Sequence, residues 1–478
     1  MCKSGDTRTV TARRLRSSVF DGLVGKLLRF GREEAGNMSL LTIFGSMSLV
    51  ALGGVGIDLM YAEMKRTKVQ ATLDRAVLAA ADLDQTLDPE GVMRDYFDKM
   101  LMPEALTSVS VTGGLNYRKV TGTAHVDMPS NFTSMLGVEG LKADGTATAE
   151  EHIKNVEVSL VLDISGSMGE NNRLVNMKSA ANTFIDTLLT SDNAANTSIS
   201  LVPYSEHVNA GPSLTSALNV NWQHSYSHCI EFDSADYDST GLNMTKQYAQ
   251  MQHFQWNYFG GNDLTDTICP RYYYERIQPL SKDAAKLKNQ VNALQPRAGT
   301  QIFMGMKWGA ALLNPSSQPL TVASINAGLS DPSFSNRPAA LTDANTLKTI
   351  VLMTDGQNSD TYRLANWAYD SANDRAHWAS YNLWYYLQRN VAQRNWPAFY
   401  WQKYDGSGGD YLLDNICEAA KNDGIVVWTV GFETTEHGKS VMRDCASSPS
   451  HYFEVQGTEI EDAFSSIARS INQLRLTQ

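Results

Sequence analysis

The sequence predicts an α/β protein whose main domain is a doubly wound, mostly parallel sheet with insertions. A transmembrane helix, a helical stalk and a small β-rich module are expected to precede it. Three observations predict this fold class. Residues 38–57 are 20 positions without a charge, residues 106–150 alternate β-branched and small polar residues, and apolar strands alternate with amphipathic helices from residue 156. Strands that are apolar on both faces belong in a sheet covered by helices on both sides.

The N-terminal region predicts a membrane anchor. Residues 1–37 are expected to be a basic tail, with eight Lys and Arg against four acids up to Glu34, and residues 38–61 a transmembrane helix. About 20 apolar residues cross a hydrocarbon core as a helix. A buried core helix and a cleaved signal peptide are the alternatives. Under the positive-inside rule, the tail stays cytoplasmic and everything after Tyr61 is exported.

Helical spacing continues beyond the apolar run. Val69, Leu73, Val77 and Ala80 recur at helical intervals, so the helix is expected to continue to about Asp84. The predicted helical stalk covers residues 62–105.

Two further regions follow the stalk. Residues 106–150 carry Gly-Gly and Asp-Gly turns between alternating residues, which predicts a β-rich linker module. Residues 155–478 form the main domain. Its segments near 206–280 and 358–412 lack the strand–helix rhythm and are rich in Tyr, Trp, Asn and Asp, so we expect them to be insertions.

Charge and cysteine usage limit the environment and the partners. The net charge is −11, which argues against a general nucleic-acid binder. Cys2 lies on the cytoplasmic side of the predicted span, and the other four cysteines lie on the exported side. Two disulfides are therefore expected in an oxidising compartment, with three connectivities open. Proximity in the sequence favours Cys229–Cys269 and Cys417–Cys445.

Polar side chains follow two of the predicted strands at the point where each strand ends. Asp163 comes directly after VEVSLVL, with Ser165 and Ser167 at alternate positions behind it, and Asp355 comes directly after LKTIVLMT. Thr300 lies between them, at the start of a predicted helix. The carboxyl ends of parallel strands converge at one edge of a sheet, where ligands bind. Carboxylate and hydroxyl oxygens suit one divalent cation, with Mg²⁺ favoured and Mn²⁺ or Ca²⁺ as alternatives.

These residues carry a resemblance. DISGS at 163–167, Thr300 and TDG at 354–356 resemble the metal-ion-dependent adhesion site of von Willebrand factor A domains. The resemblance implies that Asp163, Ser165, Ser167, Thr300 and Asp355 surround the cation. A small octahedral ion held by few protein oxygens keeps positions open for water or for a partner's carboxylate, and we expect a protein partner to supply that carboxylate.

The N-terminal half carries a second resemblance. GNMSLLTIF, the apolar run ending at Asp58 and the helix ATLDRAVLAAA are similar to the TadE/TadG family of Flp (tight-adherence) pilus-assembly proteins, over residues 35–84. The TadG type joins such a segment to a C-terminal von Willebrand A domain. CEAAKNDGIVVWTVGF and RDCASSPSHYFEV are similar to that group too, which supports the Cys417–Cys445 pair. No clear prepilin-peptidase cleavage motif is present, so N-terminal processing stays open.

Catalysis is the weaker interpretation. Ser165 has no motif-placed histidine, and no HExxH spacing occurs. Four histidines of the first insertion allow a second metal site, although solvated loop histidines are the more frequent outcome: His207, His224, His228 and His253. The GSGGD stretch at 406–410 is expected to be a loop rather than a phosphate cradle. The aromatic residues of the second insertion could recognise a partner or build a small core, and the core is favoured.

The resulting prediction is a non-enzymatic, single-pass protein of a bacterial inner membrane with a periplasmic C-terminal domain. It is expected to bind a pilus-assembly component through its cation. A surface adhesin that contacts host or matrix ligands is the alternative, and a metal-dependent hydrolase is a third interpretation.

Overall fold

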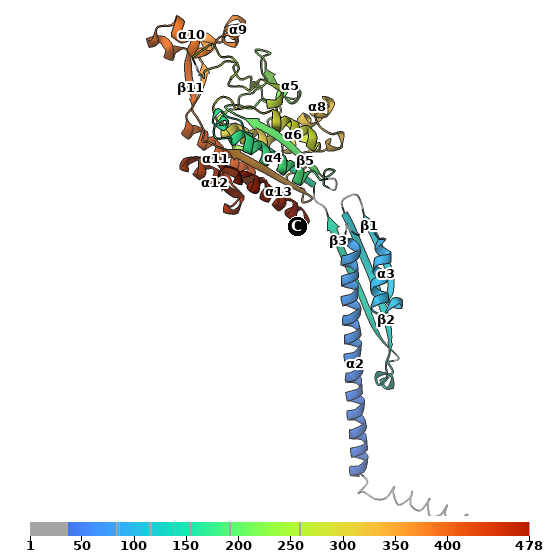
Figure 1. Cartoon of the computed structure of the whole chain (residues 1–478). Helices are drawn as coiled ribbons and strands as arrows, with labels where there is room; N and C mark the ends of the chain where they lie inside the picture. The colour runs from blue at the N-terminus through green and yellow to red at the C-terminus, as the bar shows by residue number, and fades with distance from the viewer. Residues whose placement is uncertain are drawn as a thin grey trace, which may run out of the picture. The chain divides into compact units, whose positions relative to one another are not determined.

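The computed structural model describes residues 37–82, 85, 87–113, 117–138, 140–152, 155–190, 193–257 and 260–477. The chain divides into two compact units, residues 1–152 and 153–478 (Figure 1). The expected basic tail, with Cys2, lies outside the described residues apart from its last position.

The first unit is built on the helix α2 (Asn37–Ala81), which contains both the apolar run and the first part of the predicted stalk. Val69, Leu73 and Val77 are buried, as their spacing predicts. The stalk region holds a second helix, α3 (Pro89–Lys99), which begins with a proline and is capped by the Asp88 carboxylate. Proline at the first turn sacrifices no helical hydrogen bond, so α3 starts there.

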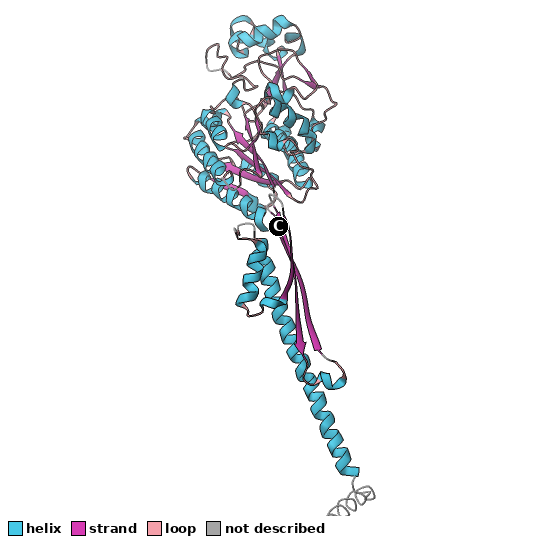
Figure 2. Ribbon diagram, turned by 90° about the vertical axis from the view of Figure 1, so that its right-hand side faces the viewer, coloured by secondary structure: helices cyan, strands magenta, loops and turns pink. Residues whose placement is uncertain are grey.

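An antiparallel sheet lies along α2 in the same unit. Its order is β1-β2-β3, and its strands run side by side with the helix in both views (Figures 1 and 2). One hydrophobic cluster joins α2, α3 and the sheet. The strands are β1 (Leu106–Gly113), β2 (Tyr117–Pro129) and β3 (Gly140–His152).

The second unit is a doubly wound α/β domain, which confirms the predicted fold class. Its sheet has the order β13-β12-β9-β4-β5-β8, parallel except for β8. The order reverses between β4 and β9, so the carboxyl ends of these two strands mark the crevice where such sheets bind ligands. The edge strand β8 has no counterpart among the expected strands. The six are β4 (Asn155–Asp163), β5 (Thr197–Tyr204), β8 (Gln278–Ser281), β9 (Thr346–Thr354), β12 (Val426–Phe432) and β13 (Tyr452–Val455).

Helices cover both faces of this sheet (Figure 2). The strand β4 shows why, because Leu160 and Leu162 point into one hydrophobic cluster while Val161 points into the other. One face is packed by α4 (Arg173–Leu188), α6 (Ala284–Ala293) and α13 (Glu459–Thr477). The other face is packed by α5 (Gly211–Thr215), α7 (Ile302–Ala311), α8 (Gln318–Asn326), α11 (Gly406–Asn422) and α12 (Glu436–Cys445).

The two insertions share one core, although they are far apart in the sequence. The first carries the short strands β6 (Val220–Asn221) and β7 (Tyr248–Ala249). The second carries β10 (Thr361–Leu364), α9 (Ala372–Ser380), α10 (Leu383–Asn390) and β11 (Tyr400–Tyr404). The favoured core interpretation thus extends to both segments, because the cluster combines residues of both: Cys229, Met251, Phe254, Ile268, Cys269, Leu364, Tyr369, Trp378, Leu383 and Leu387.

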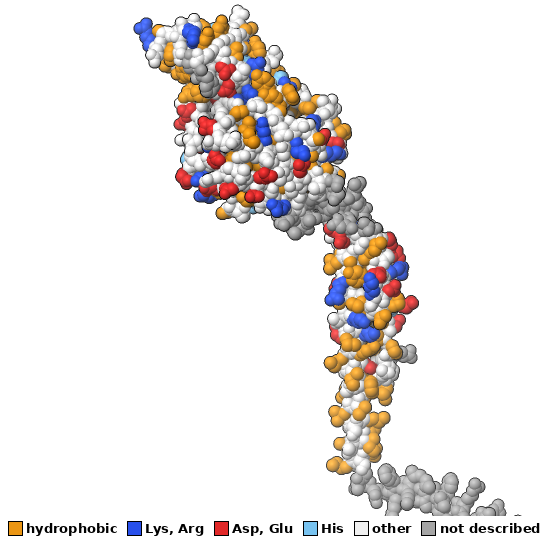
Figure 3. All heavy atoms as spheres, in the orientation of Figure 1, with side chains coloured by type: hydrophobic (Ala, Val, Ile, Leu, Met, Phe, Trp, Pro, Cys, Tyr) orange, Lys and Arg blue, Asp and Glu red, His pale blue; other side chains and the backbone are white. Residues whose placement is uncertain are grey.

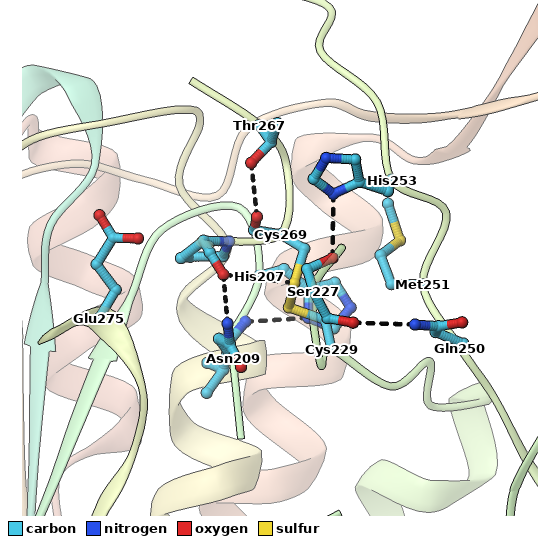
Figure 4. Close-up of a disulfide and its surroundings, with 12 residues drawn as sticks. His207, Asn209, Ser227, Cys229, Gln250, Met251, His253, Thr267, Cys269 and Glu275 are labelled. Carbon is cyan, nitrogen blue, oxygen red and sulfur yellow. Dashed lines mark hydrogen bonds between the residues drawn. A yellow bond between two sulfur atoms is a disulfide. The ribbon is translucent and has the colours of Figure 1, made fainter. Parts of the chain in front are cut away.

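Both favoured disulfides are confirmed. Cys229–Cys269 lies in the shared core of the insertions (Figure 4), and Cys417–Cys445 joins α11 to α12. The loop prediction for residues 406–410 is wrong, because these residues are the first turn of α11 and follow β11. The Asp405 carboxylate accepts a hydrogen bond from the Gly408 amide at 2.7 Å, and this cap offsets the low helix propensity of the glycines.

Candidate functional site

The predicted site residues occupy the point where the strand order reverses. Asp163 is the last residue of β4, and Asp355 directly follows β9. These strands are parallel neighbours, with Leu162 paired to Met353, so their ends lie side by side. Thr300 lies two residues before the helix α7. The sheet therefore brings segments almost 200 residues apart to one edge.

Hydroxyl and carboxylate oxygens converge in this crevice. The Ser167 hydroxyl donates to Asp355 Oδ1 at 2.7 Å, and it lies 3.1 Å from the Ser165 hydroxyl. Asp163 Oδ1 accepts from the Ser165 amide at 2.7 Å, and its Oδ2 accepts from the Thr354 hydroxyl at 2.7 Å. Each carboxylate oxygen offers about two lone-pair sites, so Asp163 keeps acceptor capacity beyond these two bonds.

Thr300 lies near this group, but its hydroxyl forms no hydrogen bond with these described residues. It is buried, and a Cβ placed at Gly356 would lie 3.8 Å from the Thr300 hydroxyl. Gly356 is the residue after Asp355. No hydrogen bond joins that hydroxyl to the other four predicted site residues, all of which the structure describes.

The donor set fits a small divalent cation. With metal–oxygen bonds of 2.0–2.1 Å, neighbouring ligands of an octahedral Mg²⁺ stand about 2.9 Å apart. The oxygen–oxygen distances of 2.7 Å and 3.1 Å at Ser167 bracket this value. All five predicted side chains offer the hard oxygen atoms that Mg²⁺, Mn²⁺ and Ca²⁺ accept.

The electrostatics of the crevice favour a cation as well. Burial raises the pKa of Asp163, and the neighbouring Asp355 carboxylate raises it further. Burial also raises the pKa of Asp355, against the hydrogen bond from Ser167 and the charge of Arg173. Two buried carboxylates that share a site resist simultaneous ionisation, and a bound cation would remove that penalty.

Sequence reasoning missed two charged residues at this edge. Arg173, the first residue of α4, donates to Asp355 Oδ2 at 3.1 Å and to Glu433 Oε2 at 2.9 Å. Glu433 directly follows β12, and the hydrogen bond from Arg173 lowers its pKa. Both had a signal in the sequence. A cation in the first turn of a helix opposes the helix dipole and so calls for an acidic partner, and an acid directly after a buried strand belongs at the same edge.

The structure does not support a second metal site in the first insertion. Among the described residues, no group of three or more His, Cys, Asp or Glu side chains could hold a metal ion. The solvated-loop interpretation is wrong for His207 and His253, which are buried around the Cys229–Cys269 disulfide (Figure 4). Burial lowers the pKa of His207 to about 4 and that of His253 to about 3, so both are neutral at pH 7.

Comparison with known families identifies the N-terminal segment. The sequence model of the Flp pilus-assembly TadE/G-like family matches residues 36–83. This segment is TadE/G-like. It coincides with α2, and the predicted resemblance over residues 35–84 is thereby confirmed. Within the described residues, Met38–Ala81 is the one helix long and apolar enough to cross a membrane. Only 6% of its apolar stretch of 18 residues is buried. The TadE/G-like segment therefore indicates membrane anchoring.

Solved structures similar to the chain include von Willebrand A domains. The von Willebrand domain of the type V pilus tip protein Mfa5 from Porphyromonas gingivalis is 16% identical, with a TM-score of 0.35 over 68% of this chain and 97% of that one. The pilus adhesin SpaC from Lactobacillus rhamnosus GG is 14% identical (TM-score 0.35), over 77% of this chain and 34% of SpaC.

A von Willebrand factor type A protein from Catenulispora acidiphila is 12% identical (TM-score 0.27), over 77% of this chain and 50% of that one. A search of curated proteins finds no match. Because these TM-scores are low, the fold assignment rests on the sheet order described above.

Proposed function

We propose that the chain is a single-pass inner-membrane protein whose C-terminal unit binds a protein partner through a divalent cation during Flp pilus assembly or anchoring. The proposal depends on one observation: the oxygens of Ser165, Ser167 and Asp355 converge where the strand order of the sheet reverses. The TadE/G-like segment at residues 36–83 supplies the pilus context. Together they favour a cation-dependent binding module held at a membrane.

In this proposal Asp163, Ser165, Ser167, Thr300 and Asp355 hold the cation, with Mg²⁺ as the favoured ion. When bound, the ion offers a coordination position to a carboxylate of the partner. The protein's own contribution is to fix the five donors before binding, through the ends of β4 and β9 and the start of α7. Such preorganisation lowers the entropy lost on association.

The orientation follows from the basic residues before α2, which keep the N-terminus cytoplasmic and place the C-terminal unit in the periplasm. The two disulfides of that unit fit an oxidising compartment. A surface adhesin is the second candidate. A metal-dependent hydrolase is the third candidate. A serine nucleophile is disfavoured, because no described histidine forms a hydrogen bond with Ser165 or Ser167.

A thermal-shift experiment tests the cation site. Mg²⁺ at about 100 times its Kd should add about 2.7 kcal/mol to the stability of the wild-type chain, which raises the Tm by several degrees. The Ser165→Ala/Ser167→Ala variant should lose this shift. The matched control is Ser448→Ala/Ser450→Ala. Those hydroxyls also pair, at 2.8 Å, but they lie just before the outer strand β13, away from the carboxyl ends of β4 and β9. A shift that persists in the first variant would remove its serines from the site.

Crosslinking in living cells tests the partner. A photoreactive amino acid at Gln357, which is exposed and two residues beyond Asp355, should capture a pilus-assembly component in a Mg²⁺-dependent manner. Protease added to intact cells should leave the C-terminal unit uncut if that unit is periplasmic. Removal of the unit by the protease would instead favour the surface adhesin.

A further inference from the structure

The loop between β2 and β3 is docked on the apolar part of α2. We call residues 130–138 the β2–β3 tip. Asp58 is buried, and its Oδ2 accepts from the Phe132 amide at 2.7 Å, the Thr133 amide at 2.9 Å and the Thr133 hydroxyl at 3.3 Å. These three donors satisfy a carboxylate that directly follows the charge-free run of the helix.

A close contact one turn earlier completes the docking. A Cβ placed at Gly54 would lie 2.2 Å from the ring of Phe132, so only glycine lets the ring approach. Gly54 and Asp58 are four residues apart and therefore share a face of the helix. Gly53 and Gly56 point elsewhere, because a Cβ at either would meet nothing within 4 Å. The tip thus covers one defined face of α2.

The position of this contact along α2 determines how deep the contact lies in the bilayer. Residues 38–57 span about 30 Å as a helix, which matches the hydrocarbon core of a bilayer. Gly54 then lies about one turn inside the edge of the core, and Asp58 just outside it. Tyr61 and Lys65, residue types that anchor helices at the membrane interface, line a cavity of about 410 Å³ just beyond, between α2 and the end of β2.

The tip itself is uncharged and presents apolar side chains to its surroundings. Met135 is 68% exposed, Leu136 66% and Val138 44%. Figure 3 shows hydrophobic side chains crowded over the part of α2 that precedes the sheet. The opposite end of the sheet is held far away, where Arg118 donates to the carbonyl of Asp82. Asp82 is 28 residues beyond Gly54, or about 42 Å along the helix.

We propose that the β2–β3 tip is a second membrane contact of this chain. On the side where α2 leaves the membrane, the side chains of Met135, Leu136 and Val138 enter the interfacial layer of the bilayer. There they contact lipids at the boundary between headgroups and acyl chains. The contact fixes the depth and the rotation of α2, because the tip sits on one helix face only. The inference rests on the proposed membrane-spanning role of α2.

Fluorescence in vesicles tests the tip. The full chain with Cys2→Ser and Met135→Cys is labelled with an environment-sensitive dye and reconstituted alone into vesicles of phosphatidylcholine and phosphatidylglycerol. We expect a blue-shifted emission that nitroxide-labelled lipids quench. Val111→Cys is the matched control, because Val111 is an exposed apolar residue of β1 near the distal end of the sheet, paired with Val120. Equal signals at both positions would overturn the proposal, and would leave a protein partner as the occupant.

A second pair of variants tests the docking. Gly54→Leu should push Phe132 away and reduce the quenching at position 135 several-fold, whereas Gly53→Leu should leave it unchanged. Both substitutions keep the helix apolar. Alkaline extraction of the vesicles separates the two proposals. A chain that resists extraction but shows no quenching at position 135 contradicts the tip contact alone, and a chain that is extracted contradicts the span and the tip together.

Discussion

At the scale of single residues, Arg173 reduces the net negative charge of the candidate site. Its guanidinium bridges Asp355 and Glu433, and its side chain is 15% exposed. It therefore compensates part of the negative charge that a divalent cation would otherwise neutralise alone. The same guanidinium repels an incoming cation, so Arg173 is expected to lower the cation affinity while it stabilises the cation-free site.

Replacement of Arg173 separates these two effects. Arg173→Ala should tighten Mg²⁺ binding by roughly tenfold, because a charge–charge repulsion of about 1–2 kcal/mol disappears. The Tm of the cation-free protein should fall, since two carboxylates lose their partner. Arg173→Lys keeps the charge and should remain close to the wild type in both respects. Titration calorimetry and thermal unfolding in EDTA measure the two outcomes, and an unchanged affinity in Arg173→Ala would contradict the repulsion.

At the scale of elements, an ion-pair group connects the two insertions. Glu231 of the first insertion bonds to Arg363 on β10 and to Lys403 on β11. Burial alone would raise the pKa of Glu231, but the charges of Arg363 and Lys403 lower it well below its ordinary value of 4.5. The strands β10 and β11 are thereby held against the first insertion.

Loss of this carboxylate should release the insertions. Glu231→Gln leaves the buried Arg363 and the half-buried Lys403 without their carboxylate partner and should cost about 3–5 kcal/mol. The pKa of Glu231 is lower in the folded than in the unfolded chain, so its ion pairs contribute fully to the stability of the wild type above pH 4.5. This contribution is lost progressively as the pH falls from 4.5 towards the folded pKa. Hydrogen exchange of β10 and β11 at pH 7 and pH 3 measures this, and the variant should lack the acid-induced step. Glu436→Gln is the control, because Glu436 is exposed and pairs with Lys439 at the surface. Its replacement should change the stability by less than about 1 kcal/mol.

The sequence predicts elements whose signal is local. The strands β4, β9 and β12 are apolar runs with an acidic residue at the strand end or just after it, so their place in a parallel sheet and the position of Asp163 and Asp355 could both be predicted. The shared core of the insertions and the docking of Phe132 on Gly54 could not, because both depend on contacts between distant segments that leave no periodic pattern. The short strand β8 escaped prediction for the same reason.

At the scale of the whole molecule, each unit has a hydrophobic core of its own. The cluster around α2 and the antiparallel sheet belongs to residues 1–152, and the two clusters on the faces of the parallel sheet belong to residues 153–478. A domain with its own core is expected to fold alone. A chain of residues 153–478 should therefore unfold cooperatively and keep the Mg²⁺-dependent thermal shift. A noncooperative transition in calorimetry would contradict this independence.

The compartment of the C-terminal unit should determine its stability. The disulfides close loops with sequence separations of 40 and 28 residues, and loops of this length contribute about 3–4 kcal/mol each by restricting the unfolded chain. The 153–478 chain made in a reducing cytoplasm should therefore have a Tm well below that of the same chain exported to the periplasm. Alkylation with mass spectrometry reports the oxidation state of each pair, and reoxidation of the cytoplasmic product in vitro is the control that should restore the Tm. Equal Tm values for the reduced and oxidised chains would show that the disulfides do not stabilise the fold, and would remove them as support for a periplasmic location.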